Sequence, residues 1–549
     1  MPEITNVCLI DAPLPLVRGF EKLGCAVLNL GDGPGQFLSL PETLEAEGFR
    51  PDMVLQVESL GRRRLITGLD RVECPTLLWC VDPHLNAHWH SAWARLFDLT
   101  CSTQGHWLPE LRTRGARDVR WLPWFGLESA WKEPSERTTD VAFVGRITEQ
   151  RSARRWLTEL LAKKTSGFNL AIRQDLNYAA MLDLYRDSRI IPNESICGEI
   201  NFRLFEGASC GCLVLGQTVE GQAELFEPGR EMDTCAHAVE LEQKLDFYLR
   251  NPRLTAAMGR AAYERVRAEH LPEHRAAQLL KFAAEATDLR ARGRTADTGT
   301  ALTASAMWEA DLLEVPAAEI FTLLEKAEPV SEVAEAAVRL EMLAGMLPAA
   351  ESTATAWLAG HTFEDSASLN LTGSMTGLRL DNFDMAKAFW YRHCKSSGGR
   401  EATPPKDETA LLTLWAKDLN RSRITLRSGF PFDPKRHLPA SASECLLTIL
   451  DKKPEHLPTL RLLDTMLRPF HGVEQSRVGL LSVLTLHERE DWRLAFEIAL
   501  ADLKSFRLES GLEELRLSRN IAQAVGQEAH FLRALKARDD SGLLVSRLE

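Results

Sequence analysis

Short apolar runs alternate with amphipathic segments along the first part of the chain. Each run ends at turn residues, and helical patterns such as 16–23, which stops at Gly24, lie between the runs. Apolar runs of this length that alternate with helices predict a parallel sheet with helices on both faces. The runs are 7–10, 26–30, 53–57 and 76–81. Residues 1–130 are therefore expected to form a Rossmann-like α/β domain.

A second series of the same kind follows a polar link at 132–139. Its first apolar run, 140–145, leads into a basic helical segment, and helical patterns at 240–250 and 252–270 close the series near residue 290. The further strand candidates are 169–172, 189–192 and 212–215. We expect a second Rossmann-like domain over residues 138–290.

The pattern changes after Arg290. Residues 291–300 are small and polar, which predicts a linker. From residue 301 Ala, Leu and Glu dominate, and amphipathic helices follow one another, for example over 332–347 and 460–467. Helix pairs around short turns predict a helical domain of tetratricopeptide-like repeats of about 34 residues over 301–549, and an irregular helical bundle is the alternative.

Composition narrows the function classes. The chain has 549 residues, 45% hydrophobic and 26% charged, with a formal net charge of -12, which excludes a general nucleic-acid binder because basic excess is lacking. Its 11 cysteines lack paired metal-ligand spacing and predict reduced, mostly buried thiols. No leader pattern and no run of 18 apolar residues is present, so we expect a cytoplasmic protein without its own membrane anchor.

The segment 193–211 carries the most specific chemical pattern. A helix over 200–210, stopped by Gly211, places Arg203 and Glu206 on one face. The amino end of such a helix offers free N–H groups and a positive dipole to a diphosphate. A carboxylate farther along the helix can accept hydrogen bonds from ribose hydroxyls.

This segment resembles the C-terminal domain of GT-B glycosyltransferases, most closely the CgeB-like group with its Asn-x-Arg-x-Phe-Glu-x-x-x-x-Gly signature. The segments 224–231 and 265–270, the latter followed by Arg275, continue the order of that group. The resemblance covers about residues 140–285. It implies two Rossmann-like domains (GT-B) followed by an all-α domain, and a metal-independent, hexosyltransferase-type enzyme that needs no cofactor beyond a nucleoside diphosphate sugar as donor.

By the same resemblance, Asn201, Arg203 and Glu206 contact the donor nucleotide, with Glu206 on the ribose. The turn Gly145-Arg146 and the nearby Arg151 are where these enzymes meet the donor phosphates, because the guanidinium fork holds phosphate oxygens with two hydrogen bonds.

Two further predictions concern charged neighbours of these residues. Arg154 and Arg155 are expected on a solvated helix face. The broad family-4 glycosyltransferases have seven residues between their two glutamates, whereas six separate Glu199 from Glu206 here. Glu199 therefore either contacts the sugar or biases the amino end of the helix.

In the first domain, Asp82 and His84 follow the end of a predicted strand, where ligands bind in open α/β sheets. The stretch resembles the aromatic-x-x-Asp-Pro element of the CgeB-like group. Asp82 or His84 is then the general base on the acceptor hydroxyl in an inverting transfer, whereas a retaining transfer needs none. Alternatively Asp82 caps the next helix. Glu58 also follows the end of a predicted strand. We assign no metal to the histidines near His84.

These observations lead to a main hypothesis and two alternatives. The main hypothesis is the transfer of a sugar from a nucleoside diphosphate sugar to an acceptor that the helical domain recruits, a protein such as a flagellar or other surface protein. The first alternative is a non-catalytic scaffold with a degenerate GT-B fold and helical repeats for protein interaction. A nucleotide-sugar epimerase of the same fold is the second.

Overall fold

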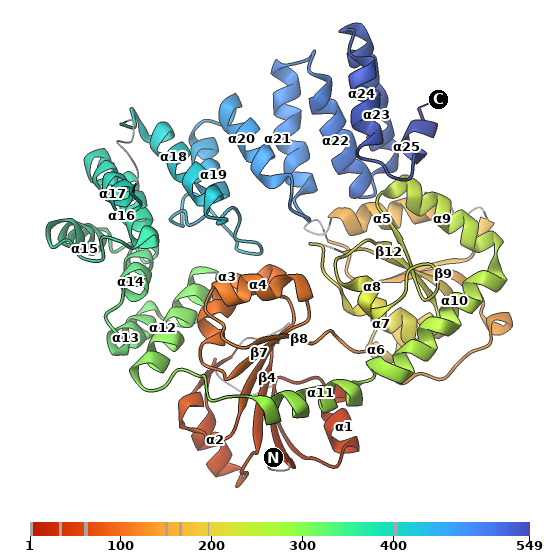
Figure 1. The fold of residues 1–549 in the computed structure, drawn as a ribbon, viewed down its shortest axis with the longest axis horizontal. Coiled ribbons are helices and arrows are strands. Elements are labelled where there is room, and N and C mark those ends of the chain that lie inside the picture. Colours follow the sequence, from red (N-terminus) through yellow and green to blue (C-terminus); the bar gives the residue numbers. More distant parts are fainter. Residues whose placement is uncertain are drawn as a thin grey trace. The chain divides into compact units, whose positions relative to one another are not determined.

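Two units, each built on one parallel sheet, make up the chain (Figure 1). The computed structural model describes residues 4–31, 36–59, 64–148, 152–163, 167–195, 197–398 and 404–548. Unit 1 consists of residues 1–122 and 276–459, and unit 2 of residues 123–275 and 460–549. Each unit therefore contains one α/β half and part of the helical second half of the chain. The expected fold class, two parallel-sheet α/β parts followed by helices, is confirmed.

The sheet of unit 1 has six strands in the order β2-β1-β4-β6-β7-β8, and all neighbours are parallel. Its strands are β1 (Asn6–Ile10), β2 (Ala26–Leu30), β4 (Met53–Val57), β6 (Thr76–Cys80), β7 (Leu99–Ser102) and β8 (Val119–Trp121). The pair β3 (Phe37–Ser39) and β5 (Leu65–Thr67) forms a separate small ladder. The four predicted strands are confirmed within one residue at each end.

Helices of unit 1 come from both parts of the chain. Those of the α/β half are α1 (Leu14–Lys22), α2 (Leu40–Ala46), α3 (Pro83–Ala94) and α4 (Leu108–Thr113), and α11 (Pro272–Glu285) leads back into the unit. Those that follow are α12 (Arg294–Glu309), α13 (Ala317–Lys326), α14 (Ser331–Leu343), α15 (Leu347–Ala359), α16 (Ala367–Arg379), α17 (Phe383–Ser396), α18 (Glu408–Arg421) and α19 (Ala442–Lys452). These helices begin at uneven intervals and so do not confirm tetratricopeptide-like repeats, which stay a prediction.

The prediction of a linker at 291–300 is wrong, because most of this stretch belongs to helix α12. The helix packs against α3, and Ala301, Ala304 and Met307 join the core of the first sheet. A Cβ atom on Gly299 would lie 2.8 Å from Leu96 Cδ2, so the small residue allows the two helices to approach closely. Small side chains here serve helix packing rather than a flexible link.

The sheet of unit 2 has five parallel strands in the order β10-β9-β11-β12-β13. The strands are β9 (Thr139–Val144), β10 (Leu170–Arg173), β11 (Ser188–Asn193), β12 (Leu213–Gln217) and β13 (Asp233–Cys235). The helices of this half are α5 (Ser152–Lys163), α6 (Tyr178–Arg186), α7 (Phe202–Ser209), α8 (Gln222–Leu225), α9 (Ala238–Arg250) and α10 (Pro252–Arg265). The predicted helix at 200–210 is confirmed, and Gly211 ends it with a φ of +69°.

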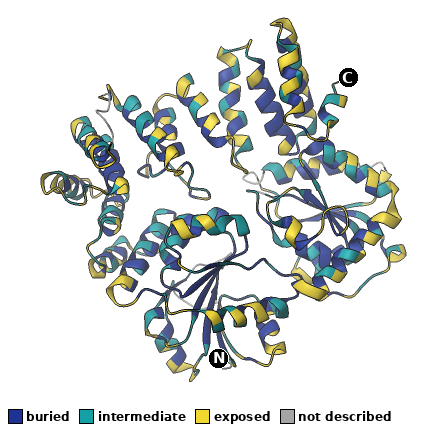
Figure 2. Cartoon of the chain, in the orientation of Figure 1, coloured by how far each residue is buried: buried dark blue, intermediate teal, exposed yellow. Residues whose placement is uncertain are grey.

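Both faces of this sheet are covered, as the buried strands in Figure 2 show. Val141, Phe143 and Leu213 face one side together with α5 and α9. Ala142 and Ile191 face the other side together with Tyr185 of α6. The alternation along β9 follows from the two-residue period of a strand and explains why residues 141–144 are all apolar.

The last helices of the chain belong to unit 2, and those from Trp492 onward join its apolar core. They are α20 (Leu457–Leu467), α21 (Glu474–His487), α22 (Trp492–Lys504), α23 (Leu508–Ala524), α24 (Glu528–Lys536) and α25 (Leu543–Ser546). Phe496, Leu503 and Phe531 are buried in one continuous apolar cluster with residues of α5, α9 and strand β9. Residues 460–548 are thus an integral part of unit 2, and we call them the helical tail.

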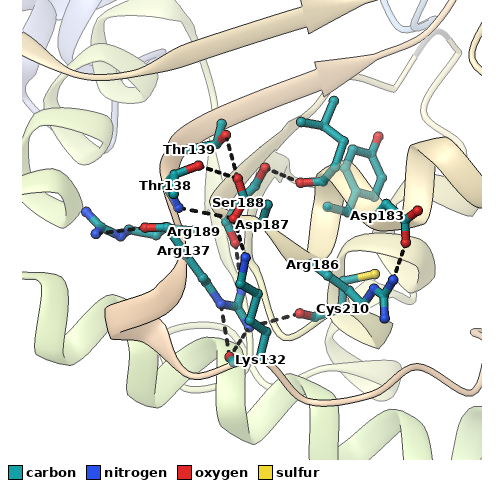
Figure 3. A network of polar contacts seen from close by, with 12 residues as sticks. Lys132, Arg137, Thr138, Thr139, Asp183, Arg186, Asp187, Ser188, Arg189 and Cys210 are labelled. Carbon is teal, nitrogen blue, oxygen red and sulfur yellow. Dashed lines mark hydrogen bonds and ion pairs between the residues drawn. The ribbon is translucent and has the colours of Figure 1, made fainter.

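Arg137 fixes the amino ends of the strands in unit 2 (Figure 3). Its buried guanidinium donates to the carbonyl oxygens of Ser188 at 2.6 Å and of Cys210 and Gly211 at 3.0 Å. Asp187 accepts from Lys132 Nζ at 2.5 Å beside it. This polar network lies at the end of the sheet opposite to the carboxyl ends of the strands.

Within the described ranges, no helix combines the length and the apolar composition that a membrane crossing requires. None of the 11 cysteines, all of them among the described residues, forms a disulfide, and most of them are buried, as the sequence predicted.

Candidate functional site

The carboxyl ends of the unit 2 strands bring together the loops that carry the predicted donor residues. Strand β9 ends before Gly145, β11 runs into Glu194, and β12 ends at Gln217. Ligands of open α/β sheets bind at this edge because the loops and the amino ends of the following helices converge there.

Two arginines and one glutamate form a buried ionic cluster at this edge. Glu194, 1% exposed, accepts from Arg154 Nε at 2.8 Å and from Arg203 Nη1 at 3.0 Å. Arg203 also donates to Asn193 Oδ1 at 3.0 Å, and its guanidinium lies 4.5 Å from the centre of the Phe143 ring. Glu194 thus holds two guanidinium groups together at this edge of the sheet.

Gly145 lies directly against this cluster. A Cβ atom at this position would be 3.1 Å from Arg203 Nη2 and 3.2 Å from Arg154 Nη1, so a larger residue would push the guanidinium groups away. Arg146 follows with a largely exposed side chain, 4.0 Å from Asp175. The structure thus places Gly145 in the cluster and Arg146 at its exposed rim. The predicted Arg151 lies outside the described residues.

Asn201 and Glu199 hold the loop between β11 and α7. Asn201 stands at the N-cap position of α7, and its Nδ2 donates to the carbonyl oxygen of Glu194 at 2.8 Å. Glu199 accepts from Ser195 Oγ at 2.9 Å and from the Cys197 N–H at 2.7 Å. The carboxylate of Glu199 therefore closes this loop, and its two predicted roles, sugar contact and bias of the helix, stay predictions.

Glu206 lies one turn beyond Arg203 on α7. Burial raises the pKa of Glu206 to about 7, although the charge of Arg203 opposes the shift. The carboxyl group therefore changes its charge near neutral pH. It accepts hydrogen bonds more strongly above this pH, where it is ionised, than below it.

The prediction that Arg154 lies on a solvated helix face is wrong. Arg154 is 6% exposed and bound to Glu194, because α5 turns this position toward the end of β11. Its neighbour Arg155 is about half exposed and lies 3.7 Å from Glu159, as expected. Sequence reasoning also missed Glu194, whose only signal is a carboxylate placed directly after a buried strand.

The acceptor-side candidates belong to unit 1. Asp82 is partly exposed at the N-cap position of α3, but its side chain makes no capping hydrogen bond. His84 is buried, with 3% exposed. Glu58 is also buried and accepts from the N–H groups of Val81 and Asp82 at 2.7 and 2.8 Å. Glu58 therefore stabilises the turn that presents Asp82.

In the part of the chain that the structure describes, no group of three or more His, Cys, Asp or Glu side chains could hold a metal ion.

A family model described as "Glycosyl transferase-like" matches residues 126–281. The match contains all five strands of unit 2, the cluster of Arg154, Glu194 and Arg203, and helix α7. This match supports glycosyltransferase activity.

Several solved structures are similar to this chain. One is HepE of Anabaena in complex with UDP and glucose, at 12% identity and a TM-score of 0.39, with 51% of this chain and 100% of that chain covered. Another is a glycosyltransferase from Rickettsia africae, at 14% identity and a TM-score of 0.39, with coverages of 52% and 99%. A third is sucrose-phosphate synthase from Thermosynechococcus elongatus, at 12% identity and a TM-score of 0.38, with 51% of this chain and 98% of that chain covered. No curated protein matches the chain.

Proposed function

We propose that this chain transfers a sugar, of the hexose type, from a nucleoside diphosphate sugar to an acceptor, and that the carboxyl edge of the unit 2 sheet binds the donor. The observation that carries the proposal is the buried cluster of Arg154, Glu194 and Arg203 beside the amino end of α7, which brings two guanidinium groups to this edge. The "Glycosyl transferase-like" match over residues 126–281 supports the reaction class.

Each donor residue has a physical role in this proposal. The free N–H groups at the amino end of α7 and the charge of Arg203 stabilise the diphosphate as it leaves with the electron pair of the broken C–O bond. Gly145 leaves room for the guanidinium groups, and Arg146 reaches the phosphates from the exposed rim. Glu206, when ionised, accepts hydrogen bonds from the ribose hydroxyls.

The acceptor hydroxyl oxygen forms the new bond to the anomeric carbon and loses its proton. In an inverting transfer we assign this proton to Asp82 rather than to His84, because Asp82 is partly exposed and His84 is buried. For the acceptor we propose a protein, such as a flagellar or other surface protein, recruited by the helical region. This part of the proposal rests on architecture alone.

Nucleotide binding tests the proposal directly. Calorimetric titration with UDP, GDP, dTDP and CMP and their common sugars should give saturable binding of one nucleotide. Glu206→Ala should weaken that binding at least about tenfold, because the ribose loses a charged acceptor. Glu224→Ala removes an exposed glutamate of the same unit and should bind like the unchanged protein. Absence of binding by every nucleotide would favour the scaffold alternative.

The same site should respond to pH. Since the pKa of Glu206 is about 7, its carboxyl group ionises between about pH 6 and about pH 8. Affinity for the nucleotide sugar should rise over this interval, and Glu206→Gln should remove the rise. A rise that persists in Glu206→Gln would assign the titration to another group.

Transfer should proceed without a divalent metal, because the arginines and the helix dipole neutralise the leaving diphosphate. Activity of the purified protein should be the same with and without an excess of EDTA. A loss restored by added Mg²⁺ or Mn²⁺ would contradict this prediction.

A further inference from the structure

A pocket beside the ionic cluster has walls from two distant parts of the sequence. One wall comes from the carboxyl edge of the sheet, with Ser195, Gly198 and Thr218. The other comes from the helical tail, with His471 and Lys504 among its residues. The pocket encloses about 240 Å³, below the usual range for a complete drug-sized ligand, so it fits a part of a nucleotide sugar rather than the whole molecule.

The tail is fitted closely to the loop between β11 and α7. Gly198 has a φ of +78°, and a Cβ atom there would lie 3.0 Å from His471 Cδ2. Gln217 accepts from the Ser195 N–H at 2.8 Å and donates to the carbonyl oxygen of Lys504 at 3.2 Å. The tail therefore forms a defined side of the pocket.

The tail contributes a positive, a negative and a neutral polar side chain to the pocket. Lys504 is exposed, and the charge of Glu474 acts on its ammonium group. Glu474 and Gln475, in the first turn of α21, line the same pocket. A further phosphate would be repelled by the carboxylate of Glu474, whereas sugar hydroxyls can donate to Glu474 and accept from Lys504.

We propose that the helical tail forms the sugar-selecting wall of the donor site, with Lys504 and Glu474 binding hydroxyl groups of the sugar that is transferred. The inference rests on the proposed function, because it takes the neighbouring cluster of Arg154, Glu194 and Arg203 as the place of the diphosphate. It gives the tail a direct role in donor choice, separate from any recruitment of the acceptor.

The test compares each nucleoside diphosphate with its sugar conjugate: UDP with UDP-glucose, GDP with GDP-mannose, and dTDP with dTDP-glucose. Titration calorimetry of the full chain measures both affinities for the unchanged protein, Lys504→Met and Glu474→Gln. Both variants should lose about tenfold in affinity for the sugar conjugate and keep their affinity for the nucleoside diphosphate. Lys536→Met removes an exposed lysine elsewhere in the tail and should change neither affinity.

The other outcomes overturn the inference and remain distinguishable. An equal loss for both ligands in Lys504→Met would place the phosphates in this pocket. Equal affinities of the unchanged protein for both ligands would show that the sugar makes no productive contact here. If the unchanged protein binds none of the six ligands, the proposed function itself fails. Equal thermal midpoints of the three variants and the unchanged protein exclude a loss of folding as the cause.

Discussion

Replacing Glu194 with alanine should lower the free energy of unfolding of unit 2 by about 3–5 kcal/mol, the cost of leaving buried charges without their partner. Glu194 is 1% exposed and accepts from both Arg154 and Arg203, which are themselves buried. The substitution removes the counter-charge of two largely buried guanidinium groups. Urea unfolding followed by tryptophan fluorescence measures the effect.

An exposed glutamate of the same unit provides the control. Glu227 pairs with Arg230 at the surface, where both side chains are more than half exposed, so Glu227→Ala should change the unfolding free energy by less than about 0.5 kcal/mol. Equal effects of the two substitutions would contradict the assigned role of Glu194. Nucleotide affinity should also fall in Glu194→Ala, because the two arginines lose the group that orients them.

Truncation after Thr459 should leave unit 2 strongly destabilised and prone to aggregation. The truncation removes Trp492, Phe496, Leu503 and Phe531, which are buried in one apolar cluster with α5 and α9. The outer faces of these two helices would become exposed to water. Binding of a hydrophobic dye and the thermal midpoint measure the result.

Single substitutions in the tail separate packing from chain length. Phe531→Ala should cost about 3–5 kcal/mol, whereas Leu517→Ala, at a position 47% exposed, should cost little. A truncated chain that unfolds cooperatively at the normal temperature would show that the tail is dispensable. Deletion of residues 301–549 therefore does not isolate acceptor recruitment, since it also removes core residues of both units.

The sequence predicts the sheets well where strands are long and apolar. Strands β1, β4 and β9 are buried on both faces, and their continuous apolar runs locate them. Strands β8 and β13 have three residues each, too few for a periodic signal, and were missed. The small residues of α12 predicted a linker because composition alone does not reveal that a helix must approach α3 closely.

The residues of the candidate site also differ in how far the sequence alone predicts them. Arg203 and Glu206 are read from one short helix, where spacing fixes their common face. The partnership of Arg154 with Glu194 spans 40 positions and depends on how α5 is rotated against the sheet. The contribution of His471 and Lys504 to a pocket at Gly198 depends on tertiary packing, of which the local pattern carries no trace.

The shared core of unit 2 also has a consequence for synthesis of the protein. Helix α9 ends at Arg250, whereas the helices that cover its outer face begin at Trp492, roughly 240 residues later. At typical elongation rates of about 5–20 residues per second, the ribosome needs roughly 12–50 s to make that interval. The apolar surface of α5 and α9 remains uncovered during this time, so the nascent chain is a natural client for chaperones until its last helices have left the ribosome.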